Sequence, residues 1–351
     1  MKIEELCKQI APPDESARVK AKRRWDACAK PLHSLGLLED AFSDICALTG
    51  RTDPALHPRA VYVFCADHGI VRQGVTQTGS EVTAQVARAL ARGETAVCRM
   101  AEVAGCRVVP VDMGIRDFDG AEGVIDCRIG NGTADFTAGC AMTEAQTEAA
   151  VLAGVRFVRE EQERGTKLLA AGEMGIGNTT CASAIVSVLL ERDPAAVTGR
   201  GAGLSDAGLR RKIDVIRRGI DVNRPDRADA FFVLQALGGF EIAAMCGLFL
   251  GGALYRIPVL IDGFPCATAA LVASRICPQS TCAMIASHVS AEPACGMVLD
   301  ALRKRALINA DMRLGEGTGA VSAMPLLDMA RAVCLDSYTF EEGGIEPYTP
   351  Q

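Results

Sequence analysis

Ala60–Ala66, with the sequence AVYVFCA, is the stretch that decides the fold, and Asp67-His68-Gly69 follows it directly. Seven apolar residues in succession, rich in β-branched and aromatic side chains, are typical of a strand that is buried on both faces of a sheet. Strands of this kind belong to parallel sheets whose two faces are covered by helices. The stretch therefore predicts a central strand in a parallel sheet.

Strands and helices are predicted to alternate along the rest of the chain. Five further apolar runs are predicted to be strands: residues 106–111, 167–171, 257–261, 283–286 and 306–312. Apolar residues have helical spacing over residues 81–100 and 205–220, a further helix is expected over residues 143–165, and the apolar, Gly-rich residues 231–254 are expected to form a buried helix pair. Thr143 with Gln146 forms a capping-box pattern, and Ser205 is a second helix-capping residue. This alternation predicts an α/β protein with a doubly wound, mainly parallel sheet of about six strands.

The composition limits the class of partner. The 351 residues carry a formal net charge of −6, and only 5% of them are aromatic. An acidic chain with few aromatic side chains lacks the basic surface and the stacking platforms that bind nucleic acids and anionic membranes. The longest uncharged apolar run, residues 242–255, is shorter than the roughly 18 to 20 residues of a membrane span. We expect no nucleic-acid and no membrane partner.

The cysteines and histidines indicate neither a disulfide framework nor a metal site. The 15 cysteines include no C-x-x-C pair, and the 4 histidines form no H-E-x-x-H pattern. The beginning of the chain shows no apolar leader, so we expect reduced thiols and a cytoplasmic location.

A second stretch, Arg313–Ala320 (RLGEGTGA), places one acid between two glycines. Glycine permits positive φ angles and close approach of a ligand to the backbone, so Gly315 and Gly317 can hold Glu316 against a substrate. In the alternative interpretation, the glycines form only a tight turn and Glu316 is solvated at its tip. The first interpretation is favoured because the other predicted strands also end in an acid, a hydroxyl or His288. Ligands of parallel sheets bind at these carboxyl ends, although His288 can also be a satisfied structural histidine.

Residues 172–180 (GEMGIGNTT) are the best candidate for a phosphate-binding loop. They lead from a predicted strand into an apolar helix and supply backbone N–H groups. Lys212 is a candidate for an added positive charge, whereas most basic residues around it are expected on a solvated surface. No Walker phosphate loop, no dinucleotide fingerprint between a strand and a helix, and no G-x-S-x-G elbow is present. Carboxylates beside a sugar phosphate suit glycosyl transfer through an oxocarbenium-like transition state.

Four motifs together resemble one known family. They are Ala66-Asp67-His68-Gly69, residues 173–180 (EMGIGNTT), residues 199–203 (GRGAG) and residues 313–320 (RLGEGTGA). In this order and at these separations they are similar to the nicotinate-nucleotide–dimethylbenzimidazole phosphoribosyltransferase (CobT) family of cobalamin biosynthesis. The likeness extends from about residue 30 to Phe340.

The resemblance implies a homodimeric pentosyltransferase that requires no metal and no other cofactor. Such an enzyme moves phosphoribose from nicotinate mononucleotide to 5,6-dimethylbenzimidazole, releasing nicotinate and forming α-ribazole 5′-phosphate. The resemblance also implies an α/β core over residues 58–330. A smaller helical part, made of residues 1–57 and 331–351, is expected to pack on that core.

The resemblance further implies roles for individual residues. Glu316 is implied as the general base that removes the proton from the attacking azole nitrogen. Glu173 is implied beside the ribose, and Lys212 on the phosphate side. The other implied substrate-binding residues are Gly175, Ile176, Gly177, Asn178, Thr179, Gly201, Gly203, Asp262, His288, Gly315 and Gly317, and the implied acceptor-base pocket comprises Thr76, Gln77, Thr78 and Gln85.

Two stretches depart from the family pattern. Where the family has Ser-x-aromatic-Pro in the acceptor pocket, this chain has Thr76-Gln77-Thr78-Gly79. Another benzimidazole, a purine or a phenol is therefore an alternative acceptor to dimethylbenzimidazole. The family block Ser-His-Arg-Ser-Ala-Glu-Pro-Gly-His appears here as residues 287–295, with Cys295 in place of the second histidine.

Two other functions stay open at the level of sequence. Residues 259–268 (VLIDGFPCAT) are weakly similar to the apolar run, acid pair and threonine of phosphoribosyl-pyrophosphate-dependent transferases, but they contain only one acid, Asp262. Such an enzyme would require magnesium and phosphoribosyl pyrophosphate. A non-enzymatic nucleotide or azole sensor is the second alternative, and it would bind both ligands without forming product.

Overall fold

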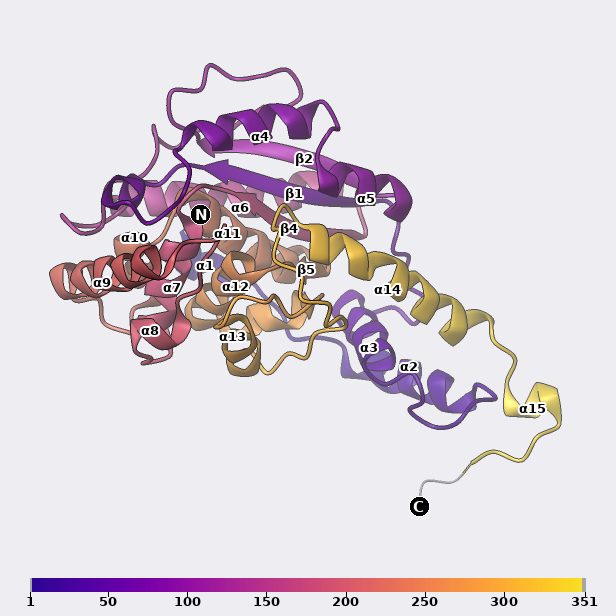
Figure 1. The fold of residues 1–351 in the computed structure, drawn as a ribbon. Coiled ribbons are helices and arrows are strands. Elements are labelled where there is room, and N and C mark those ends of the chain that lie inside the picture. The colour runs from indigo at the N-terminus through magenta and orange to yellow at the C-terminus, as the bar shows by residue number, and fades with distance from the viewer. Residues whose placement is uncertain (1, 349–351) are drawn as a thin grey trace.

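The computed structural model describes residues 2–348 and contains a six-stranded parallel sheet (Figure 1). Its strands are β1 (Arg59–Ala66), β2 (Arg107–Gly114), β3 (Ile125–Asp126), β4 (Leu168–Met174), β5 (Val259–Ile261) and β6 (Met284–Ala286). Their order across the sheet is β3-β2-β1-β4-β5-β6, and every neighbouring pair is parallel. The chain changes direction across the sheet between β1 and β4, which is the switch point where such sheets bind ligands. The predicted doubly wound α/β fold is confirmed.

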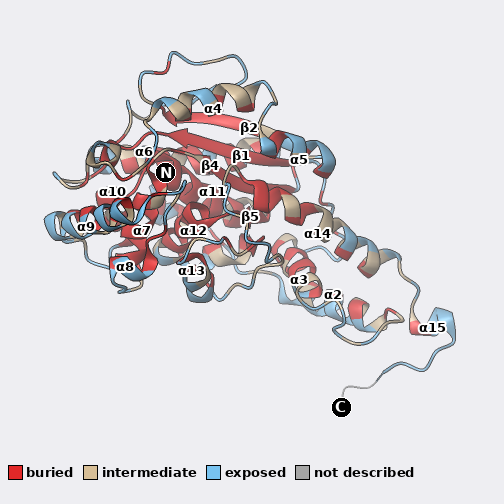
Figure 2. Cartoon of the chain, viewed as in Figure 1, coloured by how far each residue is buried: buried red, intermediate tan, exposed pale blue. Residues whose placement is uncertain are grey.

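β1 is central because its side chains are apolar on both faces. All of its residues are buried. Tyr62 and Phe64 enter the larger core on one face, and Val61 and Val63 enter a second core on the other. Figure 2 shows the buried strands enclosed by helices whose outer surfaces are exposed.

Helices cover both faces of the sheet. The larger core is formed with α1 (Ile3–Cys7), η1 (Gly69–Gln73), α6 (Glu144–Glu163), α7 (Asn178–Leu189), α8 (Pro194–Val197), α9 (Asp206–Asn223), α10 (Ala230–Leu237), α11 (Phe240–Tyr255), α12 (Phe264–Ile276), η2 (Pro278–Ala283) and α13 (Cys295–Ala301). The second core is formed with α3 (Leu37–Thr49), α4 (Glu81–Ala91), α5 (Ala96–Ala104) and α14 (Thr318–Asp336). The predicted caps of α6 and α9 are confirmed, since Thr143 Oγ1 accepts from Gln146 N and Ser205 Oγ from Gly208 N.

Two predictions of secondary structure are wrong. Residues 306–312 form no strand of the sheet, and their one bridge joins Ile308 to His288. Asp311 adopts a positive φ of 51°, which interrupts an extended chain. The sixth strand is the short β3 instead. The helix predicted over residues 81–100 is divided into α4 and α5, with Gly93 at a φ of 72° between them.

A small separate core joins α2 (Glu15–Ala27), α3 and the second half of α14, near α15 (Phe340–Gly343) in Figure 1. Its buried side chains are Ala21, Trp25, Phe42, Cys46, Ala330 and Cys334. We propose that this cluster is the smaller helical part expected from the chain ends. The proposed division differs from the expected one at α1, because Ile3 and Leu6 pack in the larger core. It differs also at α14, which is one continuous helix across residue 330.

The long apolar composition of α14 is explained by its packing against other helices of the molecule. Among residues 2–348 it is the one helix that is long and apolar enough to cross a membrane by length and composition alone. Half of its apolar window is buried inside the molecule, where α14 packs against α3 and α5.

α6 and α11 cross closely because glycines lie at their contact. A Cβ atom on Gly247 would lie 1.9 Å from the carbonyl oxygen of Val151, and one on Gly154 would lie 2.0 Å from that of Ala244. The contact brings backbone against backbone, so neither helix has room for a methyl group.

We predict that Gly247→Ala lowers the free energy of unfolding by about 1–3 kcal/mol, because overpacking forces the two helices apart. Gly296→Ala in α13 is the matched control, since its added Cβ would meet nothing within 4 Å. The control is expected to keep or raise stability, because alanine favours the helix over glycine. Urea unfolding measures both variants, and equal stability would contradict the close crossing.

Candidate active site

Loops after β1, β4, β5 and β6, together with the loop before α14, line a cavity of about 190 Å³ at the carboxyl ends of the strands. The predicted site residues that line it are Thr76, Gln77, Thr78, Glu173, Gly175, Ile176, Gly177, Asn178, Thr179, Gly201, Lys212, His288 and Gly315. Those outside the lining are Gln85, Gly203, Asp262, Glu316 and Gly317. The cavity thus gathers stretches that are far apart in the sequence at the switch point of the sheet.

The loop over residues 174–177 leads from β4 into the N-terminus of α7. Gly177 is the N-cap residue of α7 and has a φ of 101°, which residues with a side chain rarely adopt. Gly175, Gly177 and Thr179 line the cavity. The partial positive charge of the helix N-terminus is therefore presented to the cavity, as in other phosphate sites.

Lys212 of α9 reaches the first turn of α7 although it is only 1% exposed. Its Nζ donates to Thr179 Oγ1 at 2.8 Å and to the carbonyl oxygen of Gly199 at 3.2 Å. Burial lowers the pKa of Lys212 to about 8, against the opposing effect of Glu292. Because both hydrogen-bond acceptors are uncharged, the ammonium charge is available to an anion in the cavity.

A buried ion pair supports this loop from behind. His68 Nε2 lies 2.9 Å from Glu241 Oε1, and neither side chain is exposed. A Cβ atom on Gly175 would lie 3.1 Å from His68 Nε2, so the loop rests on the imidazole. Burial disfavours the imidazolium, but Glu241 and Cys181 outweigh it and raise the pKa of His68 well above its usual value. The histidine of the Ala66–Gly69 motif therefore has a structural place beneath the loop.

Glu173 is buried at the end of β4 and lines the cavity. Burial, and then the neighbouring carboxyl groups of Asp262 and Glu241, raise the pKa of Glu173 to about 8. Asn178 Nδ2 donates to Glu173 Oε2 and opposes this shift. At neutral pH the carboxyl group is largely protonated, which reduces the repulsion among the clustered acids.

Glu316 lies in a strained turn. Gly315, Glu316 and Gly317 have successive positive φ angles of 88°, 59° and 86°. A left-handed conformation costs a residue with a side chain about 1–3 kcal/mol and is often found at functional sites. Glu316 N donates to the carbonyl oxygen of Glu173 at 3.1 Å, so the turn adjoins the end of β4. Both glycines adopt the positive φ that glycine permits at no steric cost.

The carboxylate of Glu316 faces the start of α5. Burial raises its pKa, whereas the hydroxyl of Thr95 and the backbone N–H of Val97 lower it. The side chain is not a solvated tip, because Oε2 is buried, and within residues 2–348 this oxygen has no hydrogen-bond partner. A carboxylate with a raised pKa and an unused oxygen is suited to accept a proton.

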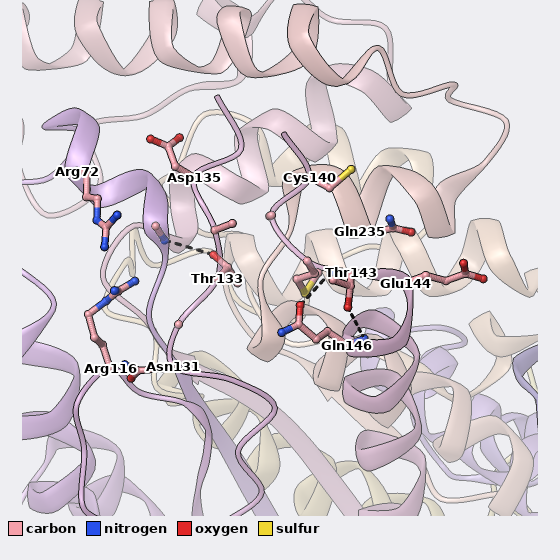
Figure 3. Close-up of a pocket in the computed structure, with 15 residues that line it drawn as sticks. Arg72, Arg116, Asn131, Thr133, Asp135, Cys140, Thr143, Glu144, Gln146 and Gln235 are labelled. Carbon is pink, nitrogen blue, oxygen red and sulfur yellow. Dashed lines mark hydrogen bonds between the residues drawn. The ribbon is translucent and has the colours of Figure 1, made fainter. Parts of the chain in front are cut away.

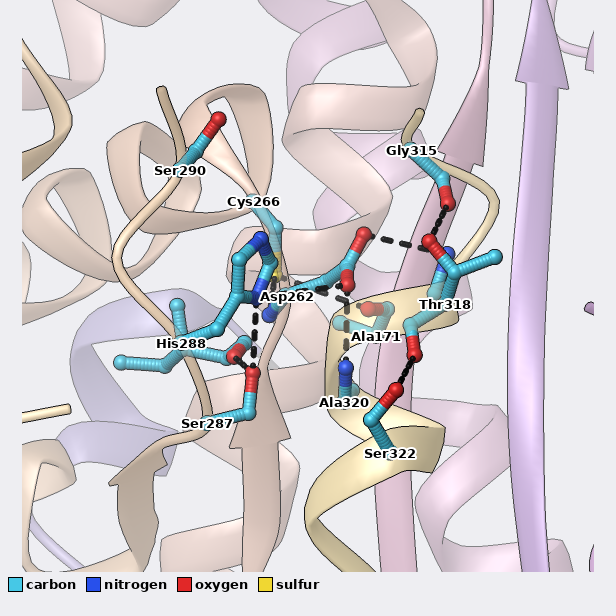
Figure 4. Close-up of polar contacts among 12 residues, drawn as sticks. Ala171, Asp262, Cys266, Ser287, His288, Ser290, Gly315, Thr318, Ala320 and Ser322 are labelled. Carbon is cyan, nitrogen blue, oxygen red and sulfur yellow. Dashed lines mark hydrogen bonds and ion pairs between the residues drawn. The ribbon is translucent and has the colours of Figure 1, made fainter. Parts of the chain in front are cut away.

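Asp262 lies behind the turn, at the end of β5 (Figure 4). It is 1% exposed, and its oxygens accept from Gly317 N at 3.1 Å and from Ala320 N at 3.0 Å. His288 Nδ1 lies 3.9 Å from Asp262 Oδ1. Each oxygen of Asp262 thus accepts from a backbone N–H group at the start of α14, and the expected contact of Asp262 with substrate stays a prediction.

Gln85 and Gly203 are two of the expected residues that do not line the cavity. Gln85 is exposed on α4. The carbonyl oxygen of Gly203 accepts a hydrogen bond from Gln77 Nε2, so Gly203 supports a residue of the expected acceptor pocket.

The sequence interpretation missed several residues of the site, among them Arg200, Glu292 and Thr95. Arg200 and Glu292 line the cavity. Arg200 lies in the GRGAG motif and Glu292 in residues 287–295, so the sequence motifs could have identified both residues. Thr95 was not detectable, because its position beside Glu316 depends on the packing of α5 against α14.

A larger and more open cleft of about 710 Å³ lies beside η1 (Figure 3). Arg72, Arg116, Thr133, Asp135 and Gln146 are among the residues that line it. It contains none of the predicted site residues, and its size reflects its opening to solvent. The smaller cavity is the candidate active site because it holds the helix N-terminus, the buried lysine and the acids. Within residues 2–348, no group of three or more His, Cys, Asp or Glu side chains is placed to hold a metal ion.

Comparisons with known proteins agree with this geometry. A family described as phosphoribosyltransferase matches residues 10–345. A relative from Acetivibrio thermocellus, named nicotinate-nucleotide–dimethylbenzimidazole phosphoribosyltransferase, is 42% identical over 330 residues, which are 94% of this chain and 94% of that protein. A relative of the same name from Desulforudis audaxviator is 43% identical over 338 residues and covers 96% of each chain.

A solved structure extends the likeness to the whole fold. The crystal structure of CobT from Thermus thermophilus superposes with a TM-score of 0.90 at 38% identity, over 95% of this chain and 100% of that one. Motifs, fold and near full-length similarity coincide, and the chain belongs to the nicotinate-nucleotide–dimethylbenzimidazole phosphoribosyltransferase family.

Proposed function

We propose that this protein transfers the phosphoribosyl group of nicotinate mononucleotide to 5,6-dimethylbenzimidazole or a related lower-ligand base. The products are nicotinate and α-ribazole 5′-phosphate, a precursor in cobalamin biosynthesis. The observation that carries the proposal is the unpartnered carboxylate oxygen of Glu316, on a turn next to a cavity that is lined by the N-terminus of α7 and by Lys212.

The donor is held by its phosphate. The N-terminus of α7 and the Lys212 ammonium supply positive charge at one end of the cavity. Gly201 leaves space beside them, since a Cβ there would lie 3.2 Å from Thr179 Oγ1 and 3.6 Å from Lys212 Nζ. Glu173, between this end and the Glu316 turn, is placed beside the ribose and accepts or donates a hydrogen bond according to its protonation.

The reaction then needs one base and no acid. The bond between the ribose C1′ and the pyridinium nitrogen breaks, and its electron pair neutralises the cationic ring, which leaves as nicotinate. The azole nitrogen forms the new bond to C1′, and the proton that the azole loses passes to Glu316. A positioned general base of this kind contributes about 10²- to 10⁴-fold to the rate.

The acceptor pocket is proposed to lie between the loop of Thr76, Gln77 and Thr78 and the Glu316 turn. These three side chains are polar and line the cavity. Gln85, exposed on α4, is proposed at the rim of this pocket. A polar lining suits a base with additional hydrogen-bonding groups, so a hydroxylated benzimidazole, a purine or a phenol competes with dimethylbenzimidazole as the preferred acceptor.

We also propose that the protein acts as a cytoplasmic homodimer. All 15 cysteines are free thiols in the structure, which suits a reducing compartment. The dimer is proposed from the family resemblance.

Nicotinate release by the purified protein tests the proposed function. We expect release from nicotinate mononucleotide only when an azole, purine or phenol of a test panel is present, with the matching nucleotide as product. A parallel reaction contains phosphoribosyl pyrophosphate and magnesium. Turnover only in that reaction would show that phosphoribosyl pyrophosphate, not nicotinate mononucleotide, is the donor. Binding of both substrates without product would indicate a sensor.

Glu316→Gln is predicted to lower kcat by about 10²- to 10⁴-fold, because the amide cannot accept the azole proton. Binding of nicotinate mononucleotide, measured by calorimetry, is expected to be retained, since the phosphate cradle is untouched. Glu316→Asp should keep more activity than the glutamine variant because it keeps a shortened carboxylate. A kcat near that of the wild type in Glu316→Gln would remove Glu316 from the role of base.

Lys212→Met is predicted to weaken binding of nicotinate mononucleotide by about 10- to 100-fold at pH 7, the loss of a charged hydrogen bond. The pKa of Lys212, about 8, is lowered by burial, so its charge is present below pH 8 and lost above it. Affinity of the wild type for nicotinate mononucleotide should therefore fall as the pH rises from 7 to 9, and the fall should be shallower in the variant.

Lys304→Met, which removes another lysine whose pKa burial lowers, is the control and should bind normally. An identical pH dependence in Lys212→Met and wild type would contradict the assignment.

A further inference from the structure

The turn that carries Glu316, the proposed general base, is hydrogen-bonded to a carboxylate that follows strand β5. Asp262 follows β5, and its two oxygens accept from the backbone N–H groups of Gly317 and Ala320 (Figure 4). Gly317 is the N-cap residue of α14 and Ala320 lies in its first turn. A carboxylate at this position satisfies helix N–H groups that lack an intrahelical partner and interacts favourably with the helix dipole.

The same carboxylate is next to a residue of the substrate cavity. His288 lines the cavity, and its Nδ1 lies 3.9 Å from Asp262 Oδ1 and 3.2 Å from Ser287 Oγ. A Cβ atom on Gly319 would lie 1.9 Å from His288 Nδ1, so the imidazole packs directly on the first turn of α14. Asp262 therefore stands between a wall of the cavity and the turn that carries Glu316.

The turn has little freedom on its other side. Glu316 N is bonded to the carbonyl oxygen of Glu173, and a Cβ atom on Gly172 would lie 2.7 Å from Gly317 N. The strained φ of Glu316 persists only while such contacts hold it. Asp262 supplies the contacts on the side of α14.

We propose that Asp262 is a positioning residue, which acts on the reaction through the placement of Glu316 and does not bind substrate. This inference rests on the proposed function, because it assumes that Glu316 is the base. A displacement of about 1 Å in a reacting group costs up to about 10²-fold in rate. An asparagine at residue 262 would offer one acceptor oxygen and would turn an N–H₂ group toward a backbone N–H, which loosens the turn.

The test separates placement from binding. Asp262→Asn is expected to lower kcat by roughly 10- to 100-fold, with the dissociation constant of nicotinate mononucleotide unchanged. In the Glu316→Gln background, Asp262→Asn should remove little further activity, because the two residues act as one unit. Weakened nucleotide binding in parallel with kcat, or full additivity of the two substitutions, would overturn the inference. Loss of activity in Glu316→Gln with no effect of Asp262→Asn would leave the proposed function intact and reject the positioning role.

A matched control and a second variant account for effects on folding. Asp112→Asn changes another 1%-exposed carboxylate that accepts from two backbone N–H groups, those of Gly114 at the end of β2 and of Ile115 directly after it, and that also pairs with Arg128. It should lower the melting temperature and leave kcat unchanged. Gly172→Ala displaces the same turn without altering Asp262, and it should reproduce the fall in kcat with normal nucleotide binding. If Asp262→Asn does not fold, a normal kcat in Gly172→Ala overturns the inference.

Discussion

The site depends on one acid, Glu316, which is held in a left-handed conformation. The turn that contains Glu316 donates backbone hydrogen bonds to groups at the ends of two neighbouring strands. Glu316 is bonded through its backbone to β4, and Gly317 after it is bonded to the carboxylate that follows β5. Without these contacts the positive φ of Glu316 would relax, since it is costly for a residue with a side chain. The parallel sheet makes the arrangement possible because it brings the carboxyl ends of β4 and β5 side by side.

Positive and negative groups are clustered separately in the site, so the two clusters are suited to different roles. The N-terminus of α7 and the buried Lys212 form a positive group beside Thr179, while Glu173, Asp262 and Glu316 form a cluster of acids around the ends of β4 and β5. Clustered buried acids raise one another's pKa values, so they do not all carry charge at neutral pH. The proposed transfer passes through an oxocarbenium-like transition state, whose positive charge neighbouring carboxylates stabilise.

The predictable parts of the fold were those with a strong local signal. β1 and β4 are continuous buried runs, and α6 and α9 begin at capping residues, so local physics agrees with the final structure. Residues 306–312 have a weaker apolar pattern, and they pair only through a single bridge, from Ile308 to His288, before the positive φ of Asp311 turns the chain. β3 has two exposed residues and no pattern of its own, because it exists only through pairing with β2.

The sequence by itself determined the α/β class, the loop from β4 into α7 and the glycine turn, because glycines, apolar runs and caps act over a few neighbouring residues. Tertiary structure alone decided the environment of each charge. The 1% exposure of Lys212, the contact of Thr95 with Glu316 and the bonds from α14 to Asp262 all join segments distant along the chain. A pKa and a hydrogen-bond partner depend on what surrounds a side chain, and those surroundings exist only after the sheet and its helices have packed.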